Sequence, residues 1–408
     1  MPSEVPTLRR SIGLRSLIFY GVGTMVGGGF YALMGKIVGE AGALAPWALA
    51  ASGLLALVNA LAFAEFSSRF PVSAGEARYV EEALGRVWLS TATGIMVVMT
   101  GIVSAAALST ATAGFVGDLI PIDPTLGVVL IVIALCAVAA WGIGESMALI
   151  VLITVVEVGA LLLVVVTNLD NMSFEGIGYQ ASSTGGVGLA GLFSAAFLGF
   201  YAFVGFEDMV NVAEEVKQPR RNLPIAIMAS VGITTLLYVA VSVVAVSSSD
   251  LGRLSASDTP IAELLGNSNI LGRTGIGIVS ILAGINGALV QIIMASRVCY
   301  GLADRGRLPS ALGRIHKRTQ TPIIATAIVA IITLFLATAL PLGQLAKATS
   351  AIILVVFALV NFSLWKLKGR TPDPSGQGPR VPRWLPLLGF VSCVAVLAGQ
   401  AYLVFGSG

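Results

Sequence analysis

The sequence contains little charge, little cysteine and almost no histidine. Charged residues make up 11% of the 408 residues, against roughly a quarter in an ordinary soluble domain. Cys136, Cys299 and Cys393 stand in apolar stretches without CxxC spacing, which argues against a disulfide framework or a cysteine metal site. The only histidine, His316, lies in a basic segment, so a catalytic triad or zinc site that needs histidine has no place to form. The sequence therefore predicts no enzyme, no metal site and no cofactor.

Two sequence patterns resemble nucleotide-binding motifs, but the residues around them argue against nucleotide binding. Residues 186–191 fit GxGxxG but open an apolar span with no strand before it, so we interpret them as a helix start. Gly35-Lys36 lacks the upstream glycine of a P-loop. The net charge of +3 is explained by basic loops and gives no reason to expect nucleic acid as a partner. The first apolar span is too long for a signal peptide and has no cleavage site, so we expect it to be retained.

Long hydrophobic runs dominate what is present. Hydrophobic residues make up 56% of the chain, and a helix needs about 20 apolar residues to cross a bilayer. This pattern predicts an all-α integral membrane protein whose partner is the lipid bilayer. The eleven predicted spans cover about 12–34, 43–66, 89–117, 125–141, 147–167, 187–213, 224–248, 275–302, 322–340, 344–366 and 384–405.

Charge placement orients these spans. With a cytoplasmic N-terminus, every lysine and arginine faces the inside except Lys36, Arg253, Arg273 and Lys347, as the positive-inside rule requires. The five tryptophans fall at the ends of apolar spans, as an interfacial belt requires. We therefore predict a multi-pass protein of the cell membrane with a cytoplasmic N-terminus and, for eleven spans, Gly408 outside.

The first span is interrupted by glycine. Five glycines stand between Gly21 and Gly29, three of them consecutive, and such a segment should break mid-membrane because glycine is a poor helix residue. Irregular backbone at this depth occurs only where it is buried in protein or lines a polar cavity. We interpret the break as a ligand site built from backbone. Close helix packing through small residues is the alternative, although three consecutive glycines exceed what a packing seam needs.

A second break, at Gly199–Gly205, follows five helices later. A five-helix unit inverts when it is repeated, and paired broken helices in inverted halves indicate the midplane site of a secondary transporter. We expect repeats over 1–168 and 187–366, followed over 367–408 by a cytoplasmic loop and one additional helix. Half-helix N-termini suit a carboxylate, and the freed carbonyls suit an ammonium group, so one site suits a zwitterion.

Three segments carry a family resemblance. GVGTMVGGGFY (21–31) resembles the first-helix signature of the amino acid, polyamine and organocation transporters, of amino acid permease type. AFVGFEDMVNVAEEVKQPRRNLPIAI (202–227) resembles the sixth helix and following loop of that family, and SRVCYGLADRGRLP (296–309) resembles the end of its eighth helix. The resemblance implies the five-plus-five inverted-repeat fold, with broken helices 1 and 6 and alternating access.

The resemblance also implies site residues. Gly27, Gly28 and Gly29 would bind the substrate carboxylate, while Met25 and Val26 would offer carbonyls to its amino group. Further carbonyls would come from Tyr201, Ala202, Phe203 and Val204, with Phe203 over the substrate as a gate. Glu214 and Glu215 resemble a structural or gating acidic pair that ties to basic loop residues such as Arg220. Many members have twelve helices and use the last two for dimer contacts, so the oligomeric state stays open.

Glu157 and Asp208 are the candidate functional acids inside the predicted spans. Glu157 is the only charge in the fifth span, where an ionised carboxylate would cost several kcal/mol unless paired or hydrated. It is a candidate proton acceptor; a permanently protonated structural acid, or a ligand for sodium or an organic cation, are the alternatives. Asp208 follows the second break, where it would recognise a basic substrate group or cap the second half-helix.

The sequence thus indicates a secondary active transporter that imports an amino acid or small organic amine with protons, driven by the proton motive force. Coupling to sodium stays open. An exchanger is the alternative within transporters, and a non-transporting substrate sensor is the alternative outside them. A channel is disfavoured because broken helices at inverted-repeat positions indicate an occluded site.

Overall fold

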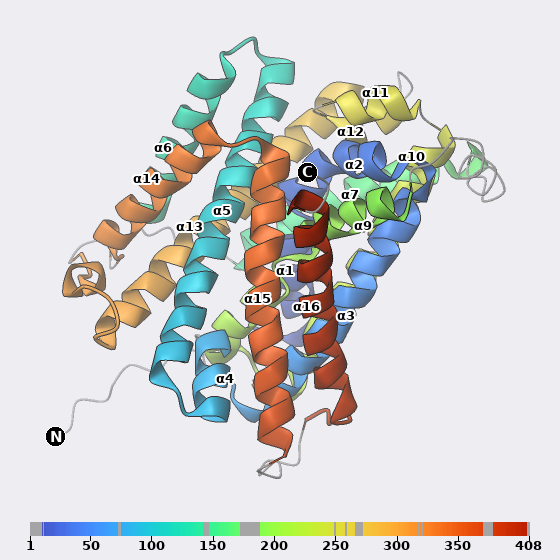
Figure 1. Ribbon diagram of the computed structural model, residues 1–408. Helices are drawn as coiled ribbons and strands as arrows, with labels where there is room; N and C mark the ends of the chain where they lie inside the picture. Colours follow the sequence, from blue (N-terminus) through green and yellow to red (C-terminus); the bar gives the residue numbers. More distant parts are fainter. Residues whose placement is uncertain are drawn as a thin grey trace.

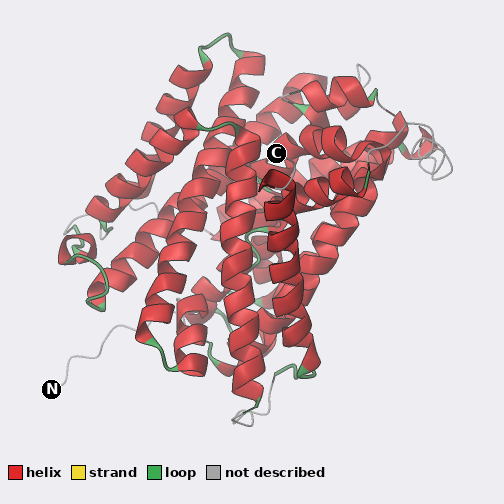
Figure 2. Ribbon diagram, in the orientation of Figure 1, coloured by secondary structure: helices red, strands yellow, loops and turns green. Residues whose placement is uncertain are grey.

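The computed structural model describes residues 10, 12–71, 75–141, 147–171, 188–248, 250–257, 259–265, 272–316, 319, 321–369 and 378–405. Over these residues the regular structure is helical, apart from one isolated parallel bridge between Ile12 and Val216 (Figure 2). Gly408 lies outside the described residues, as does the start of the GxGxxG segment. The last three residues of that segment open a helix, as its interpretation predicted.

The helices coincide with the predicted spans, and two spans are broken. The first consists of α1 (Leu14–Val26) and α2 (Gly28–Ala41), and the sixth of α9 (Leu189–Phe200), η3 (Tyr201–Phe203) and η4 (Glu207–Glu215). The unbroken spans are α3 (Ala45–Arg69), α5 (Val87–Leu119), α6 (Pro124–Trp141), α7 (Met147–Thr167), α10 (Pro219–Ser248), α13 (Gly272–Asp304), α14 (Ile323–Ala339), α15 (Leu342–Lys368) and α16 (Trp384–Phe405). Short helices connect them: η1 (Gly42–Leu44), α4 (Gly75–Leu84), η2 (Leu169–Asn171), α11 (Leu251–Ala256), α12 (Pro260–Leu264) and η5 (Ser310–Gly313).

Hydropathy agrees with a membrane protein. By length and composition, seven helical runs in the described part are long and apolar enough to span a bilayer, and four shorter apolar helices accompany them. Trp47, Trp88 and Trp384 are largely exposed near helix ends, as expected of interfacial anchors. The three cysteines are free, as predicted.

Helix pairing reflects the five-plus-five arrangement. The most extensive contacts join α5 to α13 and α3 to α10, and each pair holds the same rank in the two five-helix units. Helices α6 and α14 likewise pack together at one flank of the bundle (Figure 1). Helix α16 stands outside the ten-helix core, against α15 and α3 (Figure 1). This is the inverted-repeat transporter fold with one additional helix.

Ion pairs join the segments predicted to lie on the inner side. Glu65, near the end of α3, pairs with Arg69 at 2.5 Å and with Lys368 of α15 at 2.6 Å. Arg307, after α13, donates to Glu81 of α4 at 2.8 Å. This hydrogen bond lowers the pKa of Glu81 below its ordinary value of 4.5. The basic end of the bundle is therefore tied across both repeats.

Other ion pairs join the segments predicted to lie outside. Lys347 of α15 donates to Glu40 of α2 at 2.6 Å and to Ser194 of α9 at 3.1 Å. Arg253 of α11 pairs with Glu263 of α12 at 2.7 Å. Helix α11 packs on α2 (Figure 1). Segments placed on one side by the charge analysis thus contact one another at one end of the bundle.

Candidate substrate-binding site

The first break is a short, extended junction at Gly27. Helix α1 ends at Val26 and α2 starts at Gly28, with Gly27 at φ −46° and ψ −177°. The first amides of a helix have no internal acceptor, and no side chain caps α2 at this end. The start of α2 therefore presents backbone N–H groups and positive partial charge.

The three consecutive glycines play different structural roles. A Cβ on Gly28 would lie 2.5 Å from Cα of Gly284 on α13, whereas a Cβ on Gly27 would meet nothing closer than 3.6 Å. A Cβ on Gly29 would lie 2.8 Å from Cε1 of Tyr201. Gly27 and Gly29 line a cavity, and Gly28 is not among its lining residues. Gly28 therefore mediates close helix packing, while Gly27 and Gly29 line the cavity.

The second break lies directly against the first. After η3 the backbone becomes extended at Val204, and Gly205 has φ +130°, a conformation that L-residues with a side chain rarely adopt. A Cβ on Gly205 would also lie 2.8 Å from the carbonyl oxygen of Thr24. The Thr24 hydroxyl bonds to the carbonyls of Gly21, at 2.9 Å, and Gly205, at 3.1 Å. The two interrupted helices are thus joined at their breaks.

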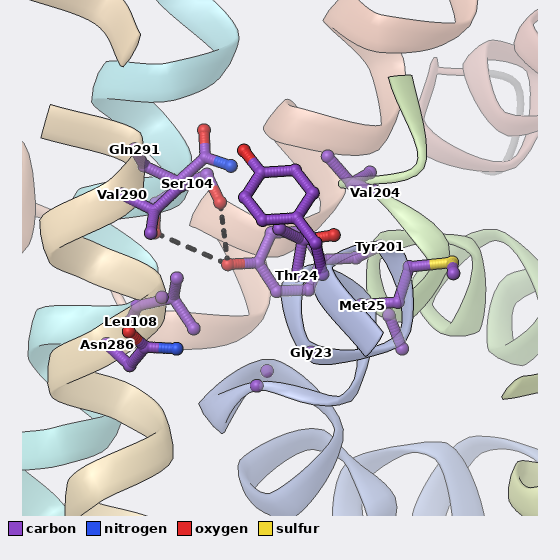
Figure 3. Close-up of a pocket in the computed structure, with 15 residues that line it drawn as sticks. Gly23, Thr24, Met25, Ser104, Leu108, Tyr201, Val204, Asn286, Val290 and Gln291 are labelled. Atoms are coloured by element: carbon purple, nitrogen blue, oxygen red, sulfur yellow. Dashed lines mark hydrogen bonds between the residues drawn. The ribbon is translucent and has the colours of Figure 1, made fainter. Parts of the chain in front are cut away.

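The cavity lies where the two breaks meet α5 and α13 (Figure 3). The Tyr201 hydroxyl lies 3.2 Å from the Ser104 hydroxyl and 3.3 Å from the Ser104 carbonyl oxygen, on α5. The residues that line the cavity are Tyr20, Gly23, Thr24, Met25, Gly27, Gly29, Ser104, Leu108, Tyr201, Ala202, Val204, Asn286, Gly287, Val290 and Gln291. Six of the predicted substrate residues are among them: Met25, Gly27, Gly29, Tyr201, Ala202 and Val204.

Four predicted substrate residues do not line this cavity: Val26, Gly28, Phe203 and Asp208. The Phe203 ring, expected as a gate, is fully buried and packs edge-on against Tyr238, with centroids 5.2 Å apart. The aromatic rings at the cavity are those of Tyr20 and Tyr201. The difference arises because η3 turns successive side chains to different sides of the chain.

Tyr238 of α10 connects the two breaks, and sequence analysis did not identify it. Its hydroxyl lies 2.6 Å from the carbonyl oxygen of Met25 and 3.0 Å from that of Ala202. Its ring stacks on Phe30 with centroids 3.8 Å apart. Carbonyls freed by both breaks therefore share one hydroxyl group. The sequence signal that could have identified Tyr238 is its polar hydroxyl group within a largely apolar span.

The carboxyl group of Glu157 lies near the first break and has no hydrogen-bond partner among the described residues. The Glu157 side chain is fully buried, and within the described part of the chain neither carboxyl oxygen has a partner. The Tyr31 hydroxyl donates to the backbone carbonyl of Glu157 at 2.7 Å. One turn earlier, Thr154 fills the space that a side chain on Gly23 would occupy. Helix α7 thus holds a lone carboxyl group against the glycine-rich helix.

Three buried acids gather below the second break. The Gly205 N–H donates to Glu207 at 2.9 Å, and the side-chain amide of Gln291 donates to Asp208 at 3.1 Å. Glu76 of α4 is 2% exposed, and burial, reinforced by Asp208, raises its pKa to about 8. The Glu207 carboxyl group therefore accepts a hydrogen bond from the backbone at the second break, and Asp208 contacts α13 through Gln291.

The predicted acidic pair lies where the end of η4 contacts the segment before α1. The Ile12 N–H donates to the Glu215 carbonyl at 3.0 Å, and the Lys217 N–H donates to the Ile12 carbonyl at 2.8 Å. Arg220 is exposed at the start of α10, and no ion pair among the described side chains joins it to Glu215. The side chain of Glu214 lies outside the described residues. The segment before α1 and the end of η4 are thus joined through backbone hydrogen bonds.

Broken helices that meet at a cavity inside a ten-helix core define this protein as a membrane transporter rather than an enzyme. The sequence matches the family described as amino acid permease over residues 12–407, and the chain belongs to that family. It is 26% identical to the branched-chain amino acid permease BcaP of Bacillus subtilis, over 97% of this chain and 89% of the relative. It is 30% identical to a Mycobacterium tuberculosis protein named an uncharacterized transporter, over 99% and 92% of the two chains. It is 28% identical to a vacuolar cationic amino acid transporter of Arabidopsis thaliana, over 90% and 64%.

Proposed function

We propose that this permease imports an amino acid across the cell membrane by proton symport. The observation that carries the proposal is a cavity formed by two helix breaks, near which the buried carboxyl group of Glu157 has no partner in the described part of the chain. The relatives named as amino acid permeases and transporters support the substrate class. In this proposal the N-terminus is cytoplasmic and no cofactor is used.

The start of α2 is the proposed carboxylate site. The amides at Gly27 to Gly29 lie at a helix N-terminus, where backbone N–H groups and the helix dipole favour an anion. Gly27 and Gly29 face the cavity, and Gly28 allows α2 to approach α13 closely enough to form its wall. The substrate carboxylate would then need no basic side chain.

The substrate ammonium binds carbonyl oxygens at the two breaks in this proposal. Each carbonyl has two lone pairs, so the Tyr238 hydroxyl near Met25 and Ala202 leaves capacity for a second donor. Val26, Phe203 and Val204 hold the backbone of the breaks in place, and Tyr201 is the aromatic ring over the substrate.

Glu157 is the proposed proton site. An ionised carboxylate without a partner is costly in such surroundings, so we assign the protonated form to the helix arrangement described above. Tyr31 joins the backbone of Glu157 to α2. Movement of α7 away from α1 would hydrate the Glu157 carboxyl group and release its proton. Glu214, Glu215 and Arg220 act in the inner connection of helices 1 and 6 rather than at the substrate.

Transport by purified protein in liposomes tests this function. With an acidic outside and a mixture of labelled amino acids, we expect accumulation above the equilibrium level that collapses when a protonophore is added. Empty liposomes and a Glu157→Gln variant serve as controls. Uptake that requires amino acid on the inside and ignores the pH gradient would instead identify an exchanger. Binding without any flux would identify a substrate sensor.

A further inference from the structure

A buried carboxamide oxygen at the cavity wall has no hydrogen-bond partner among the residues described. Gln291 projects from α13 toward the cavity (Figure 3), and its side chain is 5% exposed. Its Nε2 donates to Oδ2 of Asp208 at 3.1 Å. Its Oε1 accepts no hydrogen bond from any residue that the structure describes.

Asp208 fixes the orientation of this amide. Because the NH₂ group of Gln291 donates to Asp208, the carbonyl oxygen of the amide faces away from Asp208. An ionised Asp208 only accepts hydrogen bonds and therefore holds the amide in this orientation. A buried acceptor left without a donor carries the full cost of its desolvation. A ligand that supplies an N–H group at this position removes that cost.

We propose that Gln291 determines substrate specificity by accepting a hydrogen bond from the substrate side chain. The substrate class is then amino acids whose side chain ends in an N–H donor, an amide or an ammonium group. Leu108 and Val290 line the same part of the cavity (Figure 3) and suit the methylene groups of such a side chain. Asp208 is a positioning residue, because it acts through Gln291.

This inference rests on the proposed function, which places the substrate carboxylate and ammonium at the two helix breaks. Gln291 belongs to α13, a different wall of the cavity (Figure 3). A zwitterion bound at the breaks therefore directs its side chain toward α5 and α13, where Gln291 and Asn286 are the amide side chains lining the cavity.

Matched ligand pairs test the proposal on the purified full-length protein. Norleucine resembles lysine without its ammonium group, and methionine resembles glutamine without its amide. We expect lysine or glutamine to bind about tenfold more tightly than its apolar partner, as one buried hydrogen bond supplies. Gln291→Met, which keeps side-chain volume but lacks the acceptor, should bring that ratio to one or below, because the donor group of lysine or glutamine then stays unpaired.

Several results would overturn the proposal. Equal affinity for both members of each pair in the wild type would refute it without any variant. A uniform loss of all ligands in Gln291→Met would assign the acceptor to the α-ammonium group instead. Asp208→Asn frees the amide to turn and should also reduce the ratio; an unchanged ratio would remove Asp208 from the argument. Absence of binding by any amino acid to the wild type would refute the proposed function rather than this inference.

Discussion

Alanine substitutions at the three consecutive glycines separate packing from substrate binding. At Gly28 the new Cβ would lie 2.5 Å from the Gly284 backbone, about 0.9 Å closer than the 3.4 Å at which ordinary contact begins. Backbone cannot rotate away as a side chain can, so α2 and α13 must separate. Overpacking of this kind costs about 1–3 kcal/mol. We therefore expect Gly28→Ala to lower the melting temperature by roughly 2–5 °C.

The two neighbouring glycines are the matched controls. Gly27→Ala places its Cβ no closer than 3.6 Å to another atom, so its melting temperature should stay within about 1 °C of the wild type. Its methyl group faces the cavity and should weaken substrate binding. Gly29→Ala meets the edge of the Tyr201 ring at 2.8 Å, and it should weaken binding by displacing that ring into the cavity.

Melting of purified protein, followed with and without substrate, separates the two effects. Gly28→Ala should lower the melting temperature of the empty protein, whereas Gly27→Ala and Gly29→Ala should mainly reduce the shift produced by substrate. A wild-type melting temperature in Gly28→Ala, together with a large fall in Gly27→Ala, would refute the assignment of these faces.

Three further predictions address coupling, topology and pH. Glu157→Gln should retain binding and exchange but lose accumulation driven by a pH gradient in liposomes; continued accumulation would place coupling elsewhere. A tag after Gly408 should be labelled from outside intact cells, and labelling only after permeabilisation would contradict eleven spans. Because Arg307 lowers the pKa of Glu81 below 4.5, the stabilisation from this pair is present at neutral pH and lost as the pH falls through the lowered pKa. Because the pair is partly exposed, it contributes at most about 1 kcal/mol of stability. The higher melting temperature of the wild type relative to Glu81→Gln should therefore vanish in acid. A difference that persists in acid would exclude the ion pair as its cause.

The helix breaks and spans were predictable because their signals are local. A run of apolar residues and a cluster of glycines act through hydration and backbone freedom, which depend little on neighbours. Gly205 illustrates this, since its positive φ requires glycine whatever surrounds it. The sequence could not predict which of the glycines Gly27 to Gly29 faces the cavity and which packs against α13. The direction in which each glycine faces depends on how α2 is rotated against α13, as the contrast between Gly28 and Gly29 shows.

The cavity side chains outside the two breaks were missed for a related reason. Ser104, Asn286 and Gln291 line the cavity from largely apolar spans, and only the packing of α5 and α13 brings them to the breaks. Tyr238 of α10 joins the two breaks in the same way. A polar side chain inside a membrane span is itself a functional signal. That signal identified Glu157, and applied consistently it would have identified Asn286 and Gln291.

The contacts around the breaks suggest how one proton would affect both helices. Tyr31 and the neighbouring Phe30 lie on α2; the first bonds to the backbone of Glu157, and the second stacks on Tyr238. The Tyr238 hydroxyl in turn lies within 3.0 Å of carbonyls at both breaks. Hydration of an ionised Glu157 would require α7 to move away from α1, and that movement would disturb the Tyr31 bond first. In the proposed mechanism, a change at this buried carboxyl group would therefore act on the same aromatic contacts that join the two breaks.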